Sequence, residues 1–157
     1  MFHGLMQLGV IVPVEVEGVS RPLFMLREDL PLLMCCQEPQ SSDRRARLLP
    51  PLDCMLWDRR LIAELFGFTY KWEIYTPEEQ RHYGYYVLPV LWDEGFIGRI
   101  EPVCDRRADA LVVKRFWPEA GARLTNRCMW DVEDALNSLR RFHGLSRLIW
   151  QEGWLQG

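Results

Sequence analysis

Four acidic residues of this 157-residue sequence have positions that could support catalysis. Glu101 and Asp105 flank the end of a predicted strand, and Asp53 and Asp58 flank the start of a predicted helix. Paired carboxylates act as general acid and base when their surroundings separate their pKa values. The same positions suit structural roles, because Asp58 can cap the helix and Asp105 can shape a turn. We favour the structural roles and assign no catalytic residue.

The sequence carries no local signature of other site chemistry. It has neither a G-x-S-x-G nucleophile motif nor a glycine-rich phosphate-binding motif. Its five cysteines lack C-x-x-C spacing and its three histidines are scattered, so neither a disulfide framework nor a zinc site is indicated. The adjacent Cys35 and Cys36 follow an apolar run, which favours buried free thiols over a redox pair. We therefore expect no metal and no other cofactor.

The basic residues are almost all arginines. Of 19 basic residues only Lys71 and Lys114 are lysine, and the net charge is −3. This net charge argues against a protein that binds nucleic acid through its overall charge alone. Arginine suits bidentate phosphate contacts, although a GC-rich genome would produce the same bias without a functional reason. Several arginines are paired in sequence: Arg44-Arg45, Arg59-Arg60, Arg106-Arg107 and Arg140-Arg141.

Length and composition predict a folded protein in a reducing compartment. With 48% hydrophobic and 26% charged residues, the chain can form one core, or a fragment of one unit joined to a second small unit. The first residues lack the basic, apolar and cleavage segments of a signal peptide. No apolar run reaches the roughly 18 residues that a membrane span needs. We therefore expect a cytoplasmic protein.

The first part of the sequence predicts the end of a winged helix. Residues 9–26 alternate apolar and polar side chains, turn at Glu17-Gly18 and become apolar again, which is a β-hairpin pattern. This hairpin would be the wing of a winged helix over residues 1–36, whose earlier helices are absent from this chain. Residues 37–47 are polar, contain proline and lack periodicity, so we expect a linker there.

Residues 48–157 predict a β-structure with packed helices. Asp58 and Gly67 bound a helix with apolar residues at helical spacing. From Tyr70 the pattern changes to period two in four predicted strands, YKWEIY, GYYVLPVLW, FIGRIEPV and ALVVKRFW. Residues 131–142 form an apolar helical stripe with acidic residues early and arginines late, and LSRLIW follows as an edge strand. The fold class is α+β, with a small antiparallel β-barrel or curled sheet and a C-terminal helix.

Residues 81–92, RHYGYYVLPVLW, contain four aromatic side chains and raise the question of a base-stacking surface. A stacking surface would place aromatic side chains among basic and polar ones on one face. Here the period of two residues leaves both faces apolar. We therefore expect a core strand that is covered on both sides, with Pro89 at a bulge or an edge.

Four motifs occur in an order that resembles a known family. They are L-x-P-x-D-x-x-x-W-D-R from Leu49 to Arg59, L-F-G-F-x-Y from Leu65 to Tyr70, Y-G-Y-Y-V-L-P from Tyr83 to Pro89, and a final pattern at Gly98, Arg99, Asp105 and Arg106. Together they resemble the C-terminal part of the winged-helix DNA glycosylases of the YcaQ-like type. That family repairs interstrand crosslinks and bulky alkylated bases.

The resemblance implies tandem winged-helix units and a β-barrel. Residues 1–36 would end the last winged helix, and residues 48–157 would form the barrel portion. The resemblance also implies base excision through a Gln-x-Gln or Gln-x-Asp motif in an N-terminal portion. No glutamine of this sequence begins such a motif, and Glu101 stands where the pattern has aspartate. The family's activity is therefore not carried over to this chain.

Three functions follow from these observations. The favoured one is a portion of a repair protein that binds duplex DNA through phosphate contacts. The candidate contacts are Arg81, His82, Arg99, Arg106 and Arg107. The alternative is a structural module without DNA binding, which self-associates or needs a partner chain through residues 1–36. An autonomous enzyme that uses Glu101, Asp105 and Asp53 is the least favoured.

Overall fold

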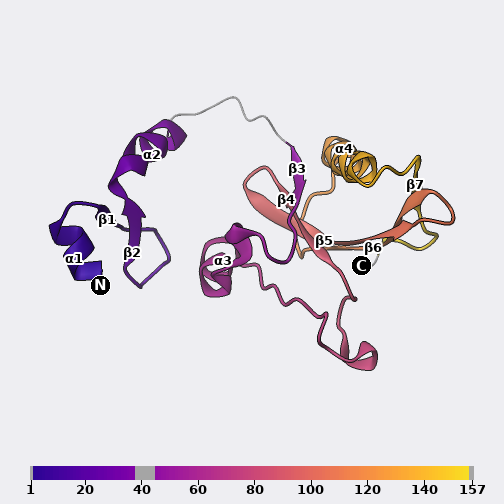
Figure 1. Ribbon diagram of the computed structural model, residues 1–157, viewed down its shortest axis with the longest axis horizontal. Coiled ribbons are helices and arrows are strands. Elements are labelled where there is room, and N and C mark those ends of the chain that lie inside the picture. Colours follow the sequence, from indigo (N-terminus) through magenta and orange to yellow (C-terminus); the bar gives the residue numbers. More distant parts are fainter. Residues whose placement is uncertain (1, 38–44, 156–157) are drawn as a thin grey trace. The chain divides into compact units, whose positions relative to one another are not determined.

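The computed structural model describes residues 2–37 and 45–155, which fall into two compact units (Figure 1). Unit 1 comprises residues 1–43 and unit 2 comprises residues 44–157. Most of the linker predicted at 37–47 lies outside the described residues. Its last part does not, and there Ala46–Leu48 form the first strand of unit 2, β3. We describe each unit by itself.

Unit 1 is a small hairpin with a short helix at each end. The helix α1 (Phe2–Gln7) leads into strands β1 (Ile11–Val14) and β2 (Leu23–Leu26), and the short 3₁₀ helix η1 (Arg27–Asp29) precedes α2 (Leu30–Gln37). The strands pair antiparallel, as predicted. The turn at Glu17-Gly18 is also confirmed, because the Val19 N–H donates to the Val16 carbonyl and Gly18 has a φ of 81°.

Unit 1 buries very little of its apolar surface. Ile11 is the only buried residue among residues 2–36. Cys35 and Cys36 are exposed, so the prediction of buried thiols was wrong. A short helix that is apolar all round can bury only the side that meets a neighbour, and both cysteines lie on sides without cover. An apolar run in the sequence therefore did not imply a core.

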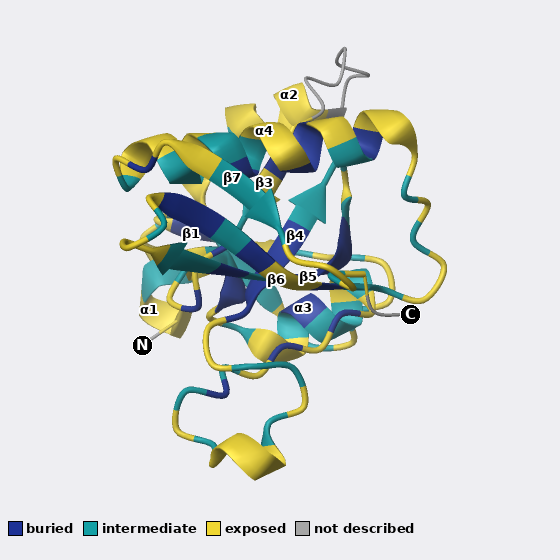
Figure 2. Cartoon of the chain, turned by 90° about the vertical axis from the view of Figure 1, so that its right-hand side faces the viewer, coloured by how far each residue is buried: buried dark blue, intermediate teal, exposed yellow. Residues whose placement is uncertain are grey.

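Unit 2 contains a five-stranded sheet that curls into a half-barrel. Its order is β3-β4-β5-β6-β7, with β4 at Leu88–Trp92, β5 at Gly95–Asp105, β6 at Ala110–Pro118 and β7 at Arg147–Trp150. Register shifts at Val90/Leu91 and Glu101/Pro102 mark bulges, which bend the sheet. Pro89, predicted at a bulge or an edge, instead pairs in register with Arg99 in an interior strand, and the bulge follows Val90. The two orthogonal views show the curled sheet with α4 along one face (Figures 1 and 2).

The last strand departs from the predicted antiparallel arrangement. The strand β7, at the predicted edge position, pairs parallel with β6. Two parallel neighbours need a long crossover between them, and here the helix α4 (Asn126–Phe142) provides it. Because α4 begins five residues before the predicted helix, the acidic Asp131 lies in its second turn rather than in its first.

The helix α3 agrees closely with its prediction. It spans Arg59–Phe66, the Asp58 carboxylate caps it by accepting from the Leu61 N–H at 2.9 Å, and Gly67 ends it with a φ of 61°. No helix in the described part of the chain is long and apolar enough to cross a membrane.

The strand β4 is covered on both faces, as predicted. Leu88 and Val90 belong to a core that also contains Val132 and Leu136 of α4. On the other face, Leu91 packs against a second core around Phe68 and Phe96.

Two expectations around β4 were wrong. Tyr85 and Tyr86 precede β4 and are exposed. Residues 70–75, predicted as a strand, contain no strand. Instead, residues 70–87 form a long loop whose polar contacts are described below.

The strand β5 has no room for a side chain at Gly98. A Cβ atom there would lie 2.5 Å from the Trp117 carbonyl oxygen and 2.9 Å from the Phe116 ring. We predict that Gly98→Ala lowers the free energy of unfolding by about 1–3 kcal/mol through overpacking. Because all seven tryptophans lie in unit 2, urea denaturation followed by tryptophan fluorescence measures the effect.

Gly95→Ala is the matched control in the same strand, since nothing lies within 4 Å of its Cβ position. Equal stability of the Gly98→Ala variant and the parent chain would contradict the prediction.

Candidate nucleic-acid interface

The loop of residues 70–87 carries two of the five predicted contacts and is held by one carboxylate. Buried Glu73 accepts hydrogen bonds from the backbone N–H groups of His82, Tyr83 and Gly84, at 3.0, 2.8 and 3.3 Å. Burial opposes ionisation of Glu73, but these three donors outweigh it and lower its pKa. The loop conformation therefore rests on an ionised Glu73.

The base of the same loop is closed by Tyr70. Its hydroxyl donates to the Val87 carbonyl at 3.1 Å. Burial, reinforced by nearby Tyr86, raises the pKa of Tyr70 to about 12, so the hydroxyl keeps its proton and remains a donor. Tyr70 and Val87 thus fix the two ends of the loop to each other.

Arg99, a predicted DNA contact, is 5% exposed and lies beneath this loop. Its guanidinium stacks between the rings of Phe68 and Tyr83, at 4.3 and 4.5 Å from their centroids. It also pairs with Glu119 and donates to the Thr69 carbonyl. Burial lowers the pKa of Arg99, while Tyr83 opposes this effect. Arg99 therefore holds the loop to the sheet and does not reach the surface.

Arg81 and His82 lie together on the loop. The Arg81 guanidinium lies 5.1 Å from the Tyr85 ring centroid, and its Nε donates to the Thr76 carbonyl at 2.9 Å. The exposed His82 ring contacts Tyr83 edge to face. The loop thus presents two basic side chains on an aromatic support, with acidic Glu78 and Glu79 nearby in the sequence.

Arg106 and Arg107 lie apart from that loop, in the turn between β5 and β6. The loop meets β5 at Glu101, since a Cβ on Gly84 would lie 2.7 Å from the Glu101 carboxylate. At about 3.3 Å per residue, Asp105 at the start of the turn lies roughly 13 Å further along the strand. The structure therefore divides the predicted contacts into two groups and buries Arg99 between the sheet and the loop.

The Arg106-Arg107 turn meets the end of α4 and the start of β7. The Arg106 Nη1 donates to the His143 carbonyl at 3.0 Å, and the Ser146 N–H donates to the Asp109 carboxylate at 3.3 Å. Arg147 donates to the Ala108 carbonyl. These contacts bring segments 105–109 and 140–147 side by side.

These two adjacent segments are rich in arginine, and we call them the arginine corner. Its members are Arg106, Arg107, Arg140, Arg141 and Arg147. The two segments contain five arginines and two aspartates, Asp105 and Asp109. Both aspartates serve local structure: Asp105 accepts from two backbone N–H groups of the turn, and hydrogen bonds from Ser146 lower the pKa of Asp109. The corner therefore has an excess of positive charge within an acidic chain.

The prediction from sequence missed three members of the corner. Arg140, Arg141 and Arg147 are about 35 to 40 positions away from the turn in the sequence. The Arg140-Arg141 pair was visible as a basic helix end, where it also complements the helix dipole. Its proximity to Arg106 depends on the crossover through α4, which the sequence did not reveal.

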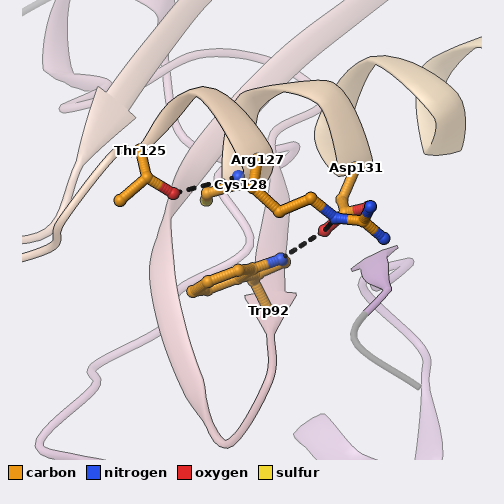
Figure 3. Close-up of polar contacts among 5 residues, drawn as sticks. All are labelled: Trp92, Thr125, Arg127, Cys128 and Asp131. Atoms are coloured by element: carbon orange, nitrogen blue, oxygen red, sulfur yellow. Dashed lines mark hydrogen bonds and ion pairs between the residues drawn. The ribbon is translucent and has the colours of Figure 1, made fainter. Parts of the chain in front are cut away.

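One buried carboxylate holds the start of α4 on the sheet (Figure 3). Asp131 accepts from the Trp92 indole N–H at 2.9 Å and from the Arg127 Nε at 3.2 Å. Thr125 caps the helix by accepting from the Cys128 N–H. Burial and the neighbouring Asp131 raise the pKa of the Cys128 thiol, which stays protonated in the core. These contacts set the direction of α4 and hence the place of its basic end.

The carboxylates considered for catalysis have structural partners. Asp53 accepts from the Met55 N–H at 2.9 Å and caps a short 3₁₀ helix at Cys54–Leu56. Glu101 lies against Gly84, and Asp105 shapes its turn. Among the described residues, no group of three or more histidine, cysteine or acidic residues could hold a metal ion.

The ionised Glu73 yields a prediction about pH. We expect Glu73→Gln to lower the free energy of unfolding by about 1–3 kcal/mol at pH 7, because charged hydrogen bonds are lost. A depressed pKa gives stability that is present above the unfolded value, near 4.3, and is lost as the pH falls through the folded value. The difference between parent and variant should therefore shrink below about pH 4. Urea denaturation at several pH values measures it.

Glu79→Gln, an exposed carboxylate of the same loop, serves as the control and should show no such difference. A pH-independent effect of Glu73→Gln would argue against an ionised anchor.

Comparison with known proteins gives the chain a family. The family described as DNA glycosylase AlkZ-like matches residues 1–142, which is most of the chain. No solved structure matches it. The match covers unit 1, the loop and all of α4. It agrees with the resemblance of the four sequence motifs to the YcaQ-like glycosylases. The chain belongs to the AlkZ-like DNA glycosylase family.

Proposed function

We propose that this chain is a DNA-binding portion of a winged-helix repair glycosylase and that the arginine corner contacts the phosphates of duplex DNA. The observation that carries the proposal is that two distant segments, 105–109 and 140–147, lie side by side and together contain five arginines. Phosphate contacts supply most of the sequence-independent affinity for DNA, and guanidinium groups bind phosphate in a bidentate way. The arginine corner thus offers local positive charge for phosphate binding, although the net charge of the chain is negative.

The members of the corner have different tasks. Arg140 donates to the carbonyls of Leu145 and Ser146 at 2.7 and 2.9 Å, and Arg147 bonds the turn, so these two shape the surface. Arg106 and Arg107 are exposed at its tip and are the proposed phosphate contacts. Phe142 at the end of α4 is also exposed and contacts His143, and an exposed aromatic ring can stack on an unpaired base.

A second contact is proposed at Arg81 and His82. Their loop is fixed by Glu73 and Arg99, so binding would cost little ordering of the backbone. Arg99 itself is left out of the interface, because its guanidinium is buried and fully engaged.

The proposed role in repair follows the family. The substrates would be crosslinked or bulky alkylated bases, and a cytoplasmic location suits a protein that acts on DNA. The sequence contains no Gln-x-Gln or Gln-x-Asp motif, so we propose that this chain binds DNA and does not excise the base itself. Unit 1, with its hairpin and flanking helices, is proposed as the end of a winged helix.

Binding to a fluorescent DNA duplex tests the corner. We expect the chain to bind with a steep salt dependence, since each phosphate contact adds about 0.9 to the slope of log K against log salt. The double variant Arg106→Gln/Arg107→Gln should lower that slope by roughly two and weaken binding at low salt. Fluorescence anisotropy at several salt concentrations provides both values.

Arg60→Gln is the control, because Arg60 is an exposed arginine of α3 whose partner is Glu64 within the same helix. It should leave the slope unchanged. The proposal fails if the parent chain binds duplex DNA no better than an unrelated acidic protein at low salt.

An alternative function rests on the open apolar surface of unit 1. Phe2, Leu8, Leu32 and Met34 are exposed there, and only Ile11 is buried among residues 2–36. Exposed apolar groups of this number mark an interaction surface. In this alternative, residues 1–36 bind a partner chain or a second copy, and the chain is a structural module without DNA binding.

Sedimentation velocity separates the alternatives. If unit 1 mediates association, the chain should sediment as a concentration-dependent oligomer, and the double variant Leu32→Ser/Met34→Ser should shift it toward monomer because apolar contact is lost. Leu52→Ser, at a 76% exposed leucine of unit 2, is the matched control. If the parent chain stays monomeric and binds DNA, the alternative is excluded and only the DNA-binding function remains.

A further inference from the structure

Three tryptophans line an open groove between the first turns of α4 and the chain that follows β7. We call it the Trp groove, and its volume is about 480 Å³. It is lined by Asn126, Met129, Trp130, Glu133, Trp150 and Trp154. The Trp groove includes neither the arginine corner nor the loop of residues 70–87. Trp150 and Trp154 also lie beyond residues 1–142, the part matched by the family.

Trp150 and Trp154 form a fixed, angled wall of the Trp groove. Their ring centroids are 4.5 Å apart and their planes meet at 53°. Trp154 is held in place because its carbonyl accepts from the Phe116 N–H at 2.6 Å and its ring contacts Phe116 edge to face. Two rings at such an angle form a V-shaped wall rather than a parallel slot. A V-shaped wall suits a compact, rounded group better than a flat one.

Trp130 faces this wall from α4 and is 60% exposed. A tryptophan that contributes little to the core and lines a groove is available for a ligand. The Arg127 guanidinium lies 4.9 Å from its ring centroid, which is the distance expected of a cation–π contact. The electron-rich ring of Trp130 thus already attracts a cation within the chain.

The charge of the Trp groove is negative. Of its six lining residues in the described structure, Glu133 is the only charged one, and it is exposed. Arg127 does not line the groove, and its charge is paired with Asp131 at 3.2 Å (Figure 3). A carboxylate beside three indole rings favours a cationic ligand over a phosphate or a nucleotide.

From these observations we infer that the Trp groove binds the head of a small quaternary ammonium compound. Methyl groups on the nitrogen fit the angled indole rings, the positive charge interacts with the ring faces, and Glu133 adds attraction. A flat aromatic cation would instead need parallel rings, which Trp150 and Trp154 do not offer. The ligand is a quaternary ammonium compound without a phosphate group, because a phosphate attached to it would be repelled by Glu133.

Isothermal titration calorimetry with the whole chain tests the inference through three probes of similar size. Choline carries the quaternary ammonium, 3,3-dimethylbutan-1-ol has the same shape without the charge, and phosphocholine adds an anionic group like that of a lipid headgroup. We expect choline to bind about tenfold more tightly than the neutral alcohol, as a cation–π contact implies. Choline should also bind more tightly than phosphocholine.

Matched variants tie the binding to the Trp groove. Trp130→Leu should weaken choline binding about tenfold, whereas Trp57→Leu, at an 83% exposed tryptophan elsewhere in unit 2, should not. Glu133→Gln should weaken it several-fold, and Asp134→Asn, the adjacent exposed carboxylate outside the groove, should leave it unchanged. All four positions are at the surface, so folding is preserved, and circular dichroism verifies it.

Four results would overturn the inference. Equal affinity for choline and 3,3-dimethylbutan-1-ol would mean a merely apolar groove. Tighter binding of phosphocholine would contradict the assignment to a ligand without a phosphate group. Absence of choline binding, or equal effects of Trp130→Leu and Trp57→Leu, would remove the Trp groove as its site.

Discussion

The surface of unit 2 depends on one buried cation. Arg99 extends from the middle of β5 and lies between Phe68 and Tyr83, and Glu119 balances its charge. A guanidinium without partners would be costly to bury, so its position requires that the loop fold over it. Phe68 in turn stacks on Phe96 at 4.1 Å. The stacked side chains of Tyr83, Arg99, Phe68 and Phe96 therefore join the loop to the second core.

The helix α4 has a comparable anchor at the opposite face of the sheet. Buried Asp131 accepts from Trp92 of β4, while Val132 and Leu136 bury their side chains against the strands. A helix fixed at its start by a directional hydrogen bond, and along its length by packing, has a defined end point. That end point brings Arg140 and Arg141 to the turn of Arg106. The same anchor places Trp130 and Glu133 opposite Trp150 and Trp154.

The two units differ in how much apolar core each one forms by itself. Among the described residues, unit 2 has two apolar cores and a five-stranded sheet, whereas unit 1 has a two-stranded hairpin and a single buried side chain. A two-stranded hairpin is marginally stable in water. Burial against a partner surface would therefore stabilise unit 1, whereas unit 2 has cores of its own.

The sequence by itself determined the elements whose signals are local. Asp58 and Gly67 bounded α3, alternating residues marked β4 to β6, and the hairpin turn at Glu17-Gly18 was visible, because caps, turns and period two act between near neighbours. The ordered motifs likewise identified the family. Only the tertiary structure decided that Arg99 is buried and that Arg106 meets His143 at the end of α4, because both depend on contacts between residues distant in sequence. The same holds for the role of Glu73, whose three partners lie nine to eleven residues away in the sequence. The alternation of residues 70–75 predicted a strand there, whereas the structure has a loop.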